Sequence, residues 1–99
     1  MNNINLEIKY IEFIKNTVFS VVEDAEIFIF GSRVQGNSQK YSDVDIAINT
    51  KEKIDINKIL RLKSLFNDSV FPYKVDIIDL NSIDENFFNI IKDDLVKIN

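Results

Sequence analysis

The sequence contains neither cysteine nor histidine. Without cysteine there is no disulfide framework and no thiolate metal site, and without histidine there is neither a Ser-His-Asp triad nor a His-based zinc site. No apolar run is long enough to span a bilayer, and residues 1–15 lack the basic start and the uninterrupted apolar segment of a signal peptide. We therefore expect a cytoplasmic protein that does not associate with membranes.

Glycine and proline are also scarce, with two glycines and one proline in 99 residues. A composition of 45% hydrophobic and 28% charged residues is typical of a globular protein, and the length predicts a single domain over residues 1–99. The formal net charge of −4 argues against direct binding of nucleic acid, which needs basic clusters. A nucleotide bound through metal ions remains compatible with this charge.

Hydrophobic periodicity and turn residues divide the chain into alternating helices and strands. Asp55 is the expected N-cap of the second helix, and the pattern Ser82-x-x-Glu85 predicts a capping box before the last helix. The predicted helices cover 6–23, 56–67 and 84–94, the predicted strands cover 26–30, 42–49 and 73–80, and a loop with one possible helical turn covers 31–41.

This order of elements predicts an α+β fold, a small mixed β-sheet with helices packed on one face. The first two strands are joined by a short loop and are expected to be antiparallel neighbours, whereas the third follows a helix and can lie parallel to the second. We expect the helix residues Lys58, Arg61 and Lys63 to form a solvated face, and Phe87, Phe88, Ile90 and Ile91 to contribute to the core.

Asp43 and Asp45 interrupt the strand over 42–49. Being two residues apart, they project from the same face, while Val44, Ile46 and Ile48 project from the other. Two carboxylates about 5 Å apart repel each other by roughly 3 kcal/mol at an effective dielectric constant of 20. A pair fixed on a strand therefore favours a bound cation, and Mg²⁺ accepts one or two carboxylates together with substrate phosphates.

The third predicted strand offers two further carboxylates, Asp76 and Asp79. They point to opposite faces, so only one of them can join the site, and their apolar neighbours do not decide which. If the third strand lies beside the second, three carboxylates converge. Such a set can hold two Mg²⁺ ions about 4 Å apart, as in phosphoryl and nucleotidyl transfer.

The stretch "GSRVQG" begins where the first strand ends. Gly31 allows close approach of the backbone to an anion, and Ser32 adds a hydroxyl that can bind phosphate. A helical turn at 32–35 would add its N-terminal dipole, and Arg33 could neutralise a terminal phosphate. Gly36 is followed by Asn37 and not by Lys-Ser/Thr, so the stretch is not a Walker A loop.

Taken together, "GSRVQG", "SDVDIAI" and "KVDIIDL" resemble the minimal nucleotidyltransferases (MNT proteins) of the DNA polymerase β superfamily, which are commonly encoded beside HEPN-domain ribonuclease toxins. The resemblance covers residues 26–80 and implies the polymerase β-like fold. It implies that Asp43, Asp45 and Asp76 are catalytic and bind two Mg²⁺, and that Gly31 and Ser32 contact the triphosphate of ATP.

The resemblance further implies transfer of AMP from ATP to a hydroxyl, typically of a tyrosine, on the HEPN toxin, which silences that toxin. This chain departs from many relatives at its end, where it reads "KDDLVKIN" instead of carrying a Glu-Gly pair. Two alternatives stay open: an antitoxin that neutralises its partner by binding alone, and a small-molecule nucleotidyltransferase, which the short chain disfavours.

Overall fold

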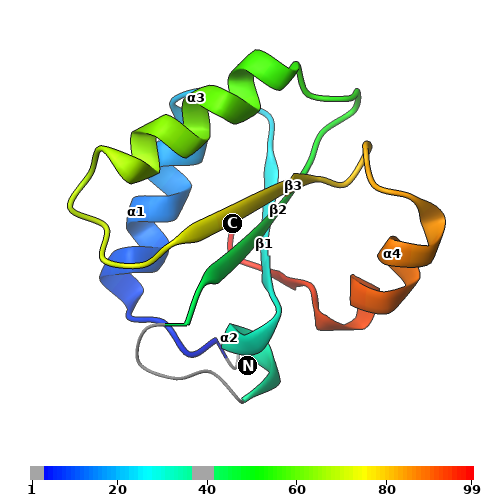
Figure 1. Cartoon of the computed structure of the whole chain (residues 1–99), viewed down its shortest axis with the longest axis horizontal. Helices are drawn as coiled ribbons and strands as arrows, with labels where there is room; N and C mark the ends of the chain where they lie inside the picture. The colour runs from blue at the N-terminus through cyan, green and yellow to red at the C-terminus, as the bar shows by residue number, and fades with distance from the viewer. Residues whose placement is uncertain (1–3, 37–41) are drawn as a thin grey trace.

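The computed structural model describes residues 4–36 and 42–99, so the predicted loop over 31–41 falls partly outside the described residues. The described chain forms one four-stranded sheet with helices on both sides (Figure 1). The strands are β1 (Glu26–Phe30), β2 (Val44–Asn49), β3 (Val75–Asp79) and β4 (Val96–Lys97), and the helices are α1 (Ile8–Phe19), α2 (Ser32–Gln35), α3 (Ile56–Asn67), α4 (Glu85–Ile91) and the 3₁₀ helix η1 (Lys92–Asp94).

The strands lie in the order β3-β2-β1-β4. β2 runs antiparallel to β1 and parallel to β3, which confirms the predicted pairings and the predicted α+β class with a mixed sheet. β4 pairs antiparallel with β1 and was not predicted. Asn99 holds this end of the chain in place, because its side chain accepts a hydrogen bond from the Ile27 N–H and donates one to the Ala25 carbonyl.

The alternation of side chains along the strands creates two different faces. Ile27 and Ile29 of β1 join the large core beneath α1 and α3, whereas Phe28 and Phe30 belong to a smaller cluster with Ile91 of α4. Figure 1 accordingly shows α1 and α3 on one side of the sheet and α4 on the other, so the prediction that the helices pack on one face is wrong for α4. The face toward α4 is only partly covered, and it is the face that carries the predicted carboxylates.

An aromatic cluster joins α1 to the segment that leads into β3. The ring of Phe71 lies 5.5 Å from those of Tyr10 and Phe13 and 5.8 Å from that of Tyr73. Phe66 of α3 completes the cluster at 5.6 Å from Phe71. Edge-to-face and stacked contacts of this kind stabilise beyond simple burial, so the start of β3 is fixed against the helical layer.

The helix ends match the sequence predictions in part. Asp55 caps α3 as predicted, accepting a hydrogen bond of 2.8 Å from the Asn57 N–H. The predicted capping box at Ser82 is wrong: Asp84 is the N-cap of α4 and accepts from the Phe87 N–H at 2.7 Å. The Ser82 hydroxyl instead donates to Asp79 at 2.9 Å. Asp and Ser are comparable N-caps, so local sequence did not separate them.

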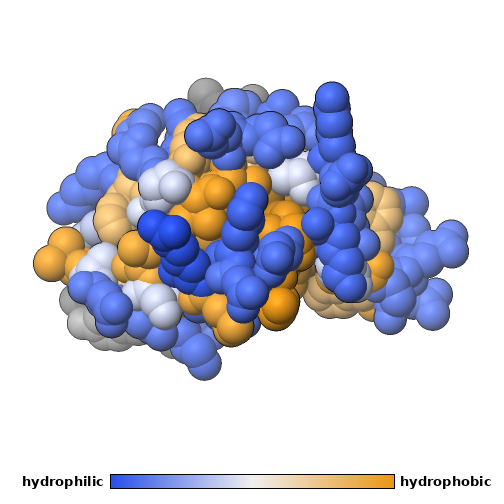
Figure 2. Space-filling view, turned by 90° about the horizontal axis from the view of Figure 1, so that it is seen from above, coloured by the Kyte–Doolittle hydropathy of each residue, from blue (hydrophilic) through white to orange (hydrophobic). Residues whose placement is uncertain are grey.

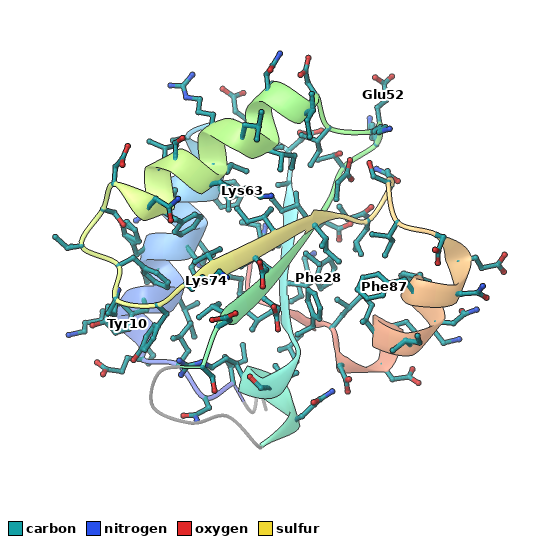
Figure 3. All side chains as sticks on the ribbon, viewed as in Figure 1. Tyr10, Phe28, Glu52, Lys63, Lys74 and Phe87 are labelled. Atoms are coloured by element: carbon teal, nitrogen blue, oxygen red, sulfur yellow. The ribbon has the colours of Figure 1, made fainter. Side chains whose placement is uncertain are left out.

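The apolar residues of α4 are less buried than predicted. Ile91 is buried, but Phe87, Phe88 and Ile90 are 37%, 38% and 74% exposed. Figure 3 shows Phe28 of β1 and Phe87 of α4 pointing toward each other across the space between sheet and helix. Among the described residues, no helix has the length and apolar character needed to cross a membrane.

Candidate active site

Asp45 and Asp76 stand side by side on the sheet face toward α4. The parallel register of β2 and β3 pairs these two residues directly, with Val44 opposite Val75 before them and Ile46 opposite Ile77 after them. Because side chains alternate along a strand, Asp43 projects from the same face two residues before Asp45. The structure thus brings together the three aspartates that the sequence singled out.

The electrostatics of this group centre on Asp45. Partial burial raises the pKa of the Asp45 carboxyl, and the neighbouring charges of Asp76 and then Asp43 raise it further. Asp43 and Asp76 themselves are exposed. Two neighbouring negative charges disfavour the charged form of the Asp45 carboxyl, which is unfavourable for the protein by itself. A bound cation would offset this repulsion.

Gly31 lies against the Asp45 carboxylate. Its backbone has φ +77°, a conformation that residues with a side chain rarely adopt. A Cβ added there would collide with Asp45 Oδ2 and lie 3.1 Å from its Cγ. The glycine is therefore required twice, for the turn from β1 into α2 and for the close approach of the carboxylate. This contact makes the glycine loop and the aspartates parts of one site.

Ser32 begins α2 directly after Gly31 and is half-buried. Within residues 4–36 and 42–99 its hydroxyl makes no hydrogen bond, so it is available to a ligand. α2 itself is a single turn that ends at Gln35, and Gly36 caps it with φ +82°. The helical turn foreseen for residues 32–35 is therefore confirmed.

The position of Arg33 contradicts the expectation that it neutralises a phosphate. The side chain is only 4% exposed, and its two terminal nitrogens donate to the carbonyls of Asn5 at 2.9 Å and Ser42 at 2.8 Å. Its guanidinium carbon lies 4.3 Å from the centre of the Tyr73 ring. Arg33 therefore joins the N-terminal segment, the residue before Asp43 and the segment before β3.

The choice between Asp76 and Asp79 is explained by burial. Asp79 is 6% exposed on the opposite face, and its oxygens accept hydrogen bonds from the N–H groups of Ile54 (2.7 Å) and Asn81 (2.9 Å) and from the Ser82 hydroxyl. A carboxylate with three donors holds a loop in place and has little capacity for a ligand. Asp76 is the one that faces Asp45.

A hollow of about 490 Å³ lies between α3 and β3, on the side of the sheet away from the three aspartates. Figure 2, which views the molecule from the side of α3, shows apolar surface surrounded by hydrophilic side chains. Asp79, the one carboxylate in the lining of this hollow, is already hydrogen-bonded. The other lining residues, Lys53, Ile54, Ile56, Ile59, Lys63, Ile77 and Ser82, add no further acidic group for metal chemistry.

The three aspartates do not form a closed metal site by themselves. Among the described residues, no group of three or more acidic side chains is arranged so that it could hold a metal ion unaided. Mg²⁺ does not require such a cage, since it commonly takes one or two carboxylates and completes its octahedron with waters and substrate phosphates. The hard oxygen donors of Asp43, Asp45 and Asp76 fit this mode of binding, which depends on the nucleotide.

Similarity to known proteins over nearly the whole chain identifies its class. The chain belongs to the polymerase β nucleotidyltransferase family, whose model matches residues 8–98. It is 35% identical over 89 residues to a Haemophilus influenzae protein named "Probable protein adenylyltransferase MntA", covering 90% of this chain and 78% of that protein.

Solved structures show the same fold. A toxin–antitoxin crystal structure with AMP-PNP matches with a TM-score of 0.75 and 22% identity, over 89% of this chain and 71% of the other. A complex of the tri-AMPylated Shewanella oneidensis HEPN toxin with its MNT antitoxin matches with a TM-score of 0.61 and 19% identity, again over 89% and 71%.

Proposed function

We propose that this chain is an Mg²⁺-dependent protein adenylyltransferase that transfers AMP from ATP to a hydroxyl, a tyrosine in the family pattern, of a HEPN-domain toxin, and so acts as its antitoxin. The observation that carries the proposal is the contact of Gly31 with Asp45 beside Asp76, because it joins a phosphate-binding turn to a metal-binding pair. The name of the H. influenzae relative and the AMPylated toxin in the S. oneidensis complex support the same activity.

Asp43, Asp45 and Asp76 are the residues that would hold two Mg²⁺ ions. When bound, the ions would neutralise the triphosphate and stabilise the charge that develops on the attacking and leaving oxygens. The raised pKa of the Asp45 carboxyl supports this assignment, because a divalent cation between the carboxylates would offset the repulsion from Asp76 and Asp43.

Gly31 and Ser32 are the residues proposed to hold the triphosphate. Gly31 lets the backbone N–H groups at the end of β1 approach the phosphate oxygens, and the Ser32 hydroxyl has no partner among the described residues that would compete. Arg33 contributes indirectly, because it donates a hydrogen bond to the carbonyl of Ser42 and so fixes the backbone directly before Asp43. Catalysis then rests on alignment of the reactants and on charge neutralisation.

The acceptor has to be delivered by another protein. Gly31, Asp45 and Asp76 occupy a sheet face that is only partly covered, and α4 beside it exposes Phe88 and Ile90. A partner that carries the acceptor hydroxyl can therefore reach the aspartates directly. Because ATP is an intracellular substrate, we place the reaction in the cytoplasm.

The test of the activity uses ATP labelled on either the α- or the γ-phosphate. Incubation with Mg²⁺ and the HEPN-domain partner should transfer the α-label to the partner and release the γ-label as pyrophosphate. Transfer of the γ-label would indicate a kinase, and retention of both labels on free nucleotide would contradict the proposed reaction. Chelation of Mg²⁺ with EDTA should abolish transfer.

A further inference from the structure

Lys74 lies immediately before β3, beside the aspartates. Continuing the register of β2 and β3 by one residue places Lys74 opposite Asp43, and the Val44 N–H donates to the Lys74 carbonyl at 2.9 Å. Lys74 also precedes Asp76 by two residues, so its side chain projects from the same face. Figure 3 shows it at the beginning of β3, the end of the sheet where β2 also begins.

The ammonium group of Lys74 is available to a ligand. The side chain is exposed, and it forms no ion pair with any described residue, although carboxylates lie on the same face. Its backbone is fixed by the hydrogen bond to β2, and Tyr73 before it belongs to the aromatic cluster. A cation on a fixed backbone beside an acidic site is well placed to meet an anionic group.

The order of the strands determines which part of the reaction Lys74 faces. Gly31 and Ser32 follow β1, Asp45 lies in β2 two residues after Asp43, and Lys74 immediately precedes β3. Two strand spacings, about 10 Å, separate β1 from β3. Asp43 and Asp45 therefore lie between the turn proposed for the triphosphate and Lys74, and Asp76 lies in the strand that Lys74 precedes.

We propose that Lys74 is a catalytic residue that contacts the acceptor oxygen. This inference rests on the function proposed above. In nucleotidyl transfer the attacking and leaving oxygens lie roughly in line on opposite sides of the phosphorus. If Gly31 and Ser32 hold the β- and γ-phosphates, pyrophosphate leaves on the β1 side and the acceptor attacks from the β3 side, where Lys74 and Asp76 lie.

The step can be written in full. The acceptor oxygen forms a bond to the α-phosphorus, the bond from that phosphorus to the oxygen bridging to the β-phosphate breaks, and the hydroxyl proton passes to water. Pyrophosphate takes the electron pair of the broken bond. Lys74 stabilises the negative charge that develops on the acceptor oxygen as its proton leaves, because a fixed cation is most effective where charge appears in the transition state.

The test compares three variants with the wild-type protein, using the HEPN-domain partner as acceptor. Lys74→Met keeps the length of the side chain but removes its charge, Lys74→Arg keeps a charge, and Lys63→Met removes an exposed lysine from α3. We expect Lys74→Met to lower kcat for AMP transfer about 100-fold with the KM for ATP unchanged. Lys74→Arg should restore most of the rate, and Lys63→Met should match the wild type.

The other results overturn the inference and are distinct from one another. A raised KM for ATP with an unchanged kcat would assign Lys74 to the triphosphate. Wild-type kinetics in Lys74→Met would make it a solvated surface residue. If the wild-type protein itself transfers no AMP, the proposed function fails and the role of Lys74 fails with it. Circular dichroism of each variant verifies that it is folded.

Discussion

Asp45 and Asp76 are paired across the parallel strands β2 and β3, so two carboxylates on different strands face the same partly open surface. Neither residue would be placed there for stability, because partial burial of Asp45, and then the charges of Asp76 and Asp43, disfavour its charged form and raise the pKa of its carboxyl. Asp79, three residues after Asp76, shows the contrasting case of a carboxylate that the fold uses for itself.

The contrast between Asp76 and Asp79 gives the first prediction. Asp76→Ala should abolish AMP transfer and leave the free energy of unfolding nearly unchanged, because Asp76 is exposed. Asp79→Ala should lower the free energy of unfolding by about 3 kcal/mol, since it removes the acceptor of three buried or half-buried donors. Urea denaturation and transfer assays measure both effects. Equal loss of activity per folded molecule in the two variants would contradict the assignment.

A second prediction concerns pH. Because the pKa of the Asp45 carboxyl is raised in the folded protein, that state binds more protons than the unfolded state between the unfolded pKa, about 3.9, and the raised value. The free energy of unfolding contributed by Asp45 therefore falls as pH rises through this window. Asp45→Asn should flatten this decline and stabilise the metal-free protein at neutral pH.

Thermal melts from pH 4 to pH 8 in the presence of EDTA measure this effect. Asp24→Asn is the control, because it removes the same charge at the opposite end of β1. Asp24 precedes the first residue of β1, whereas Asp45 pairs with the last. The Asp45→Asn variant should also lose the stabilisation that Mg²⁺ and ATP give to the wild type by binding the folded state. Identical pH slopes in the wild type and in Asp45→Asn would exclude the raised pKa.

The two glycines allow a matched comparison. Gly36→Ala should cost about 1 kcal/mol for the positive φ alone, because nothing lies within 4 Å of the added Cβ. Gly31→Ala should cost about 3 kcal/mol and abolish transfer, since its Cβ meets the Asp45 carboxylate. Denaturation and activity assays on both variants measure the difference. Full activity in Gly31→Ala would show that Asp45 can move away without consequence.

Arg33 should behave as a structural residue. Arg33→Met removes two hydrogen bonds from a charged donor and the contact with Tyr73, so we expect a loss of about 3 kcal/mol in the free energy of unfolding. Arg33→Lys should not restore it, because one ammonium group does not reproduce the planar fork. The KM for ATP of the folded fraction should stay close to that of the wild type. A tenfold rise in the KM for ATP without loss of stability would contradict this structural role and indicate that Arg33 binds a phosphate of ATP.

The sequence was informative where a local period or a short motif decides the structure. Alternation along β2 separated Asp43 and Asp45 from Val44 and Ile46, and the connection through α3 predicted the parallel pairing that brings in Asp76. These arguments require only strand geometry. They gave the mixed sheet and the side of it on which the aspartates lie.

Features that depend on distant segments were missed. The burial of Arg33 depends on carbonyls at Asn5 and Ser42 and on the Tyr73 ring, which meet only in the folded chain. β4 pairs through two residues, too few for a pattern, and its neighbour Asn99 bonds to β1 more than 70 residues away. Phe88 was expected in the core but is 38% exposed. Its burial depends on how α4 packs against the sheet, which the sequence of the helix alone does not determine.

The central claim is tested most directly by the intact mass of the purified HEPN-domain partner after incubation with this protein, ATP and Mg²⁺. The control is the Asp43→Ala, Asp45→Ala double variant. The account predicts that the partner gains mass in steps of one AMP unit, and that the double variant produces no gain. An unchanged mass together with a stable stoichiometric complex would contradict it and would mean that the partner is neutralised by binding alone.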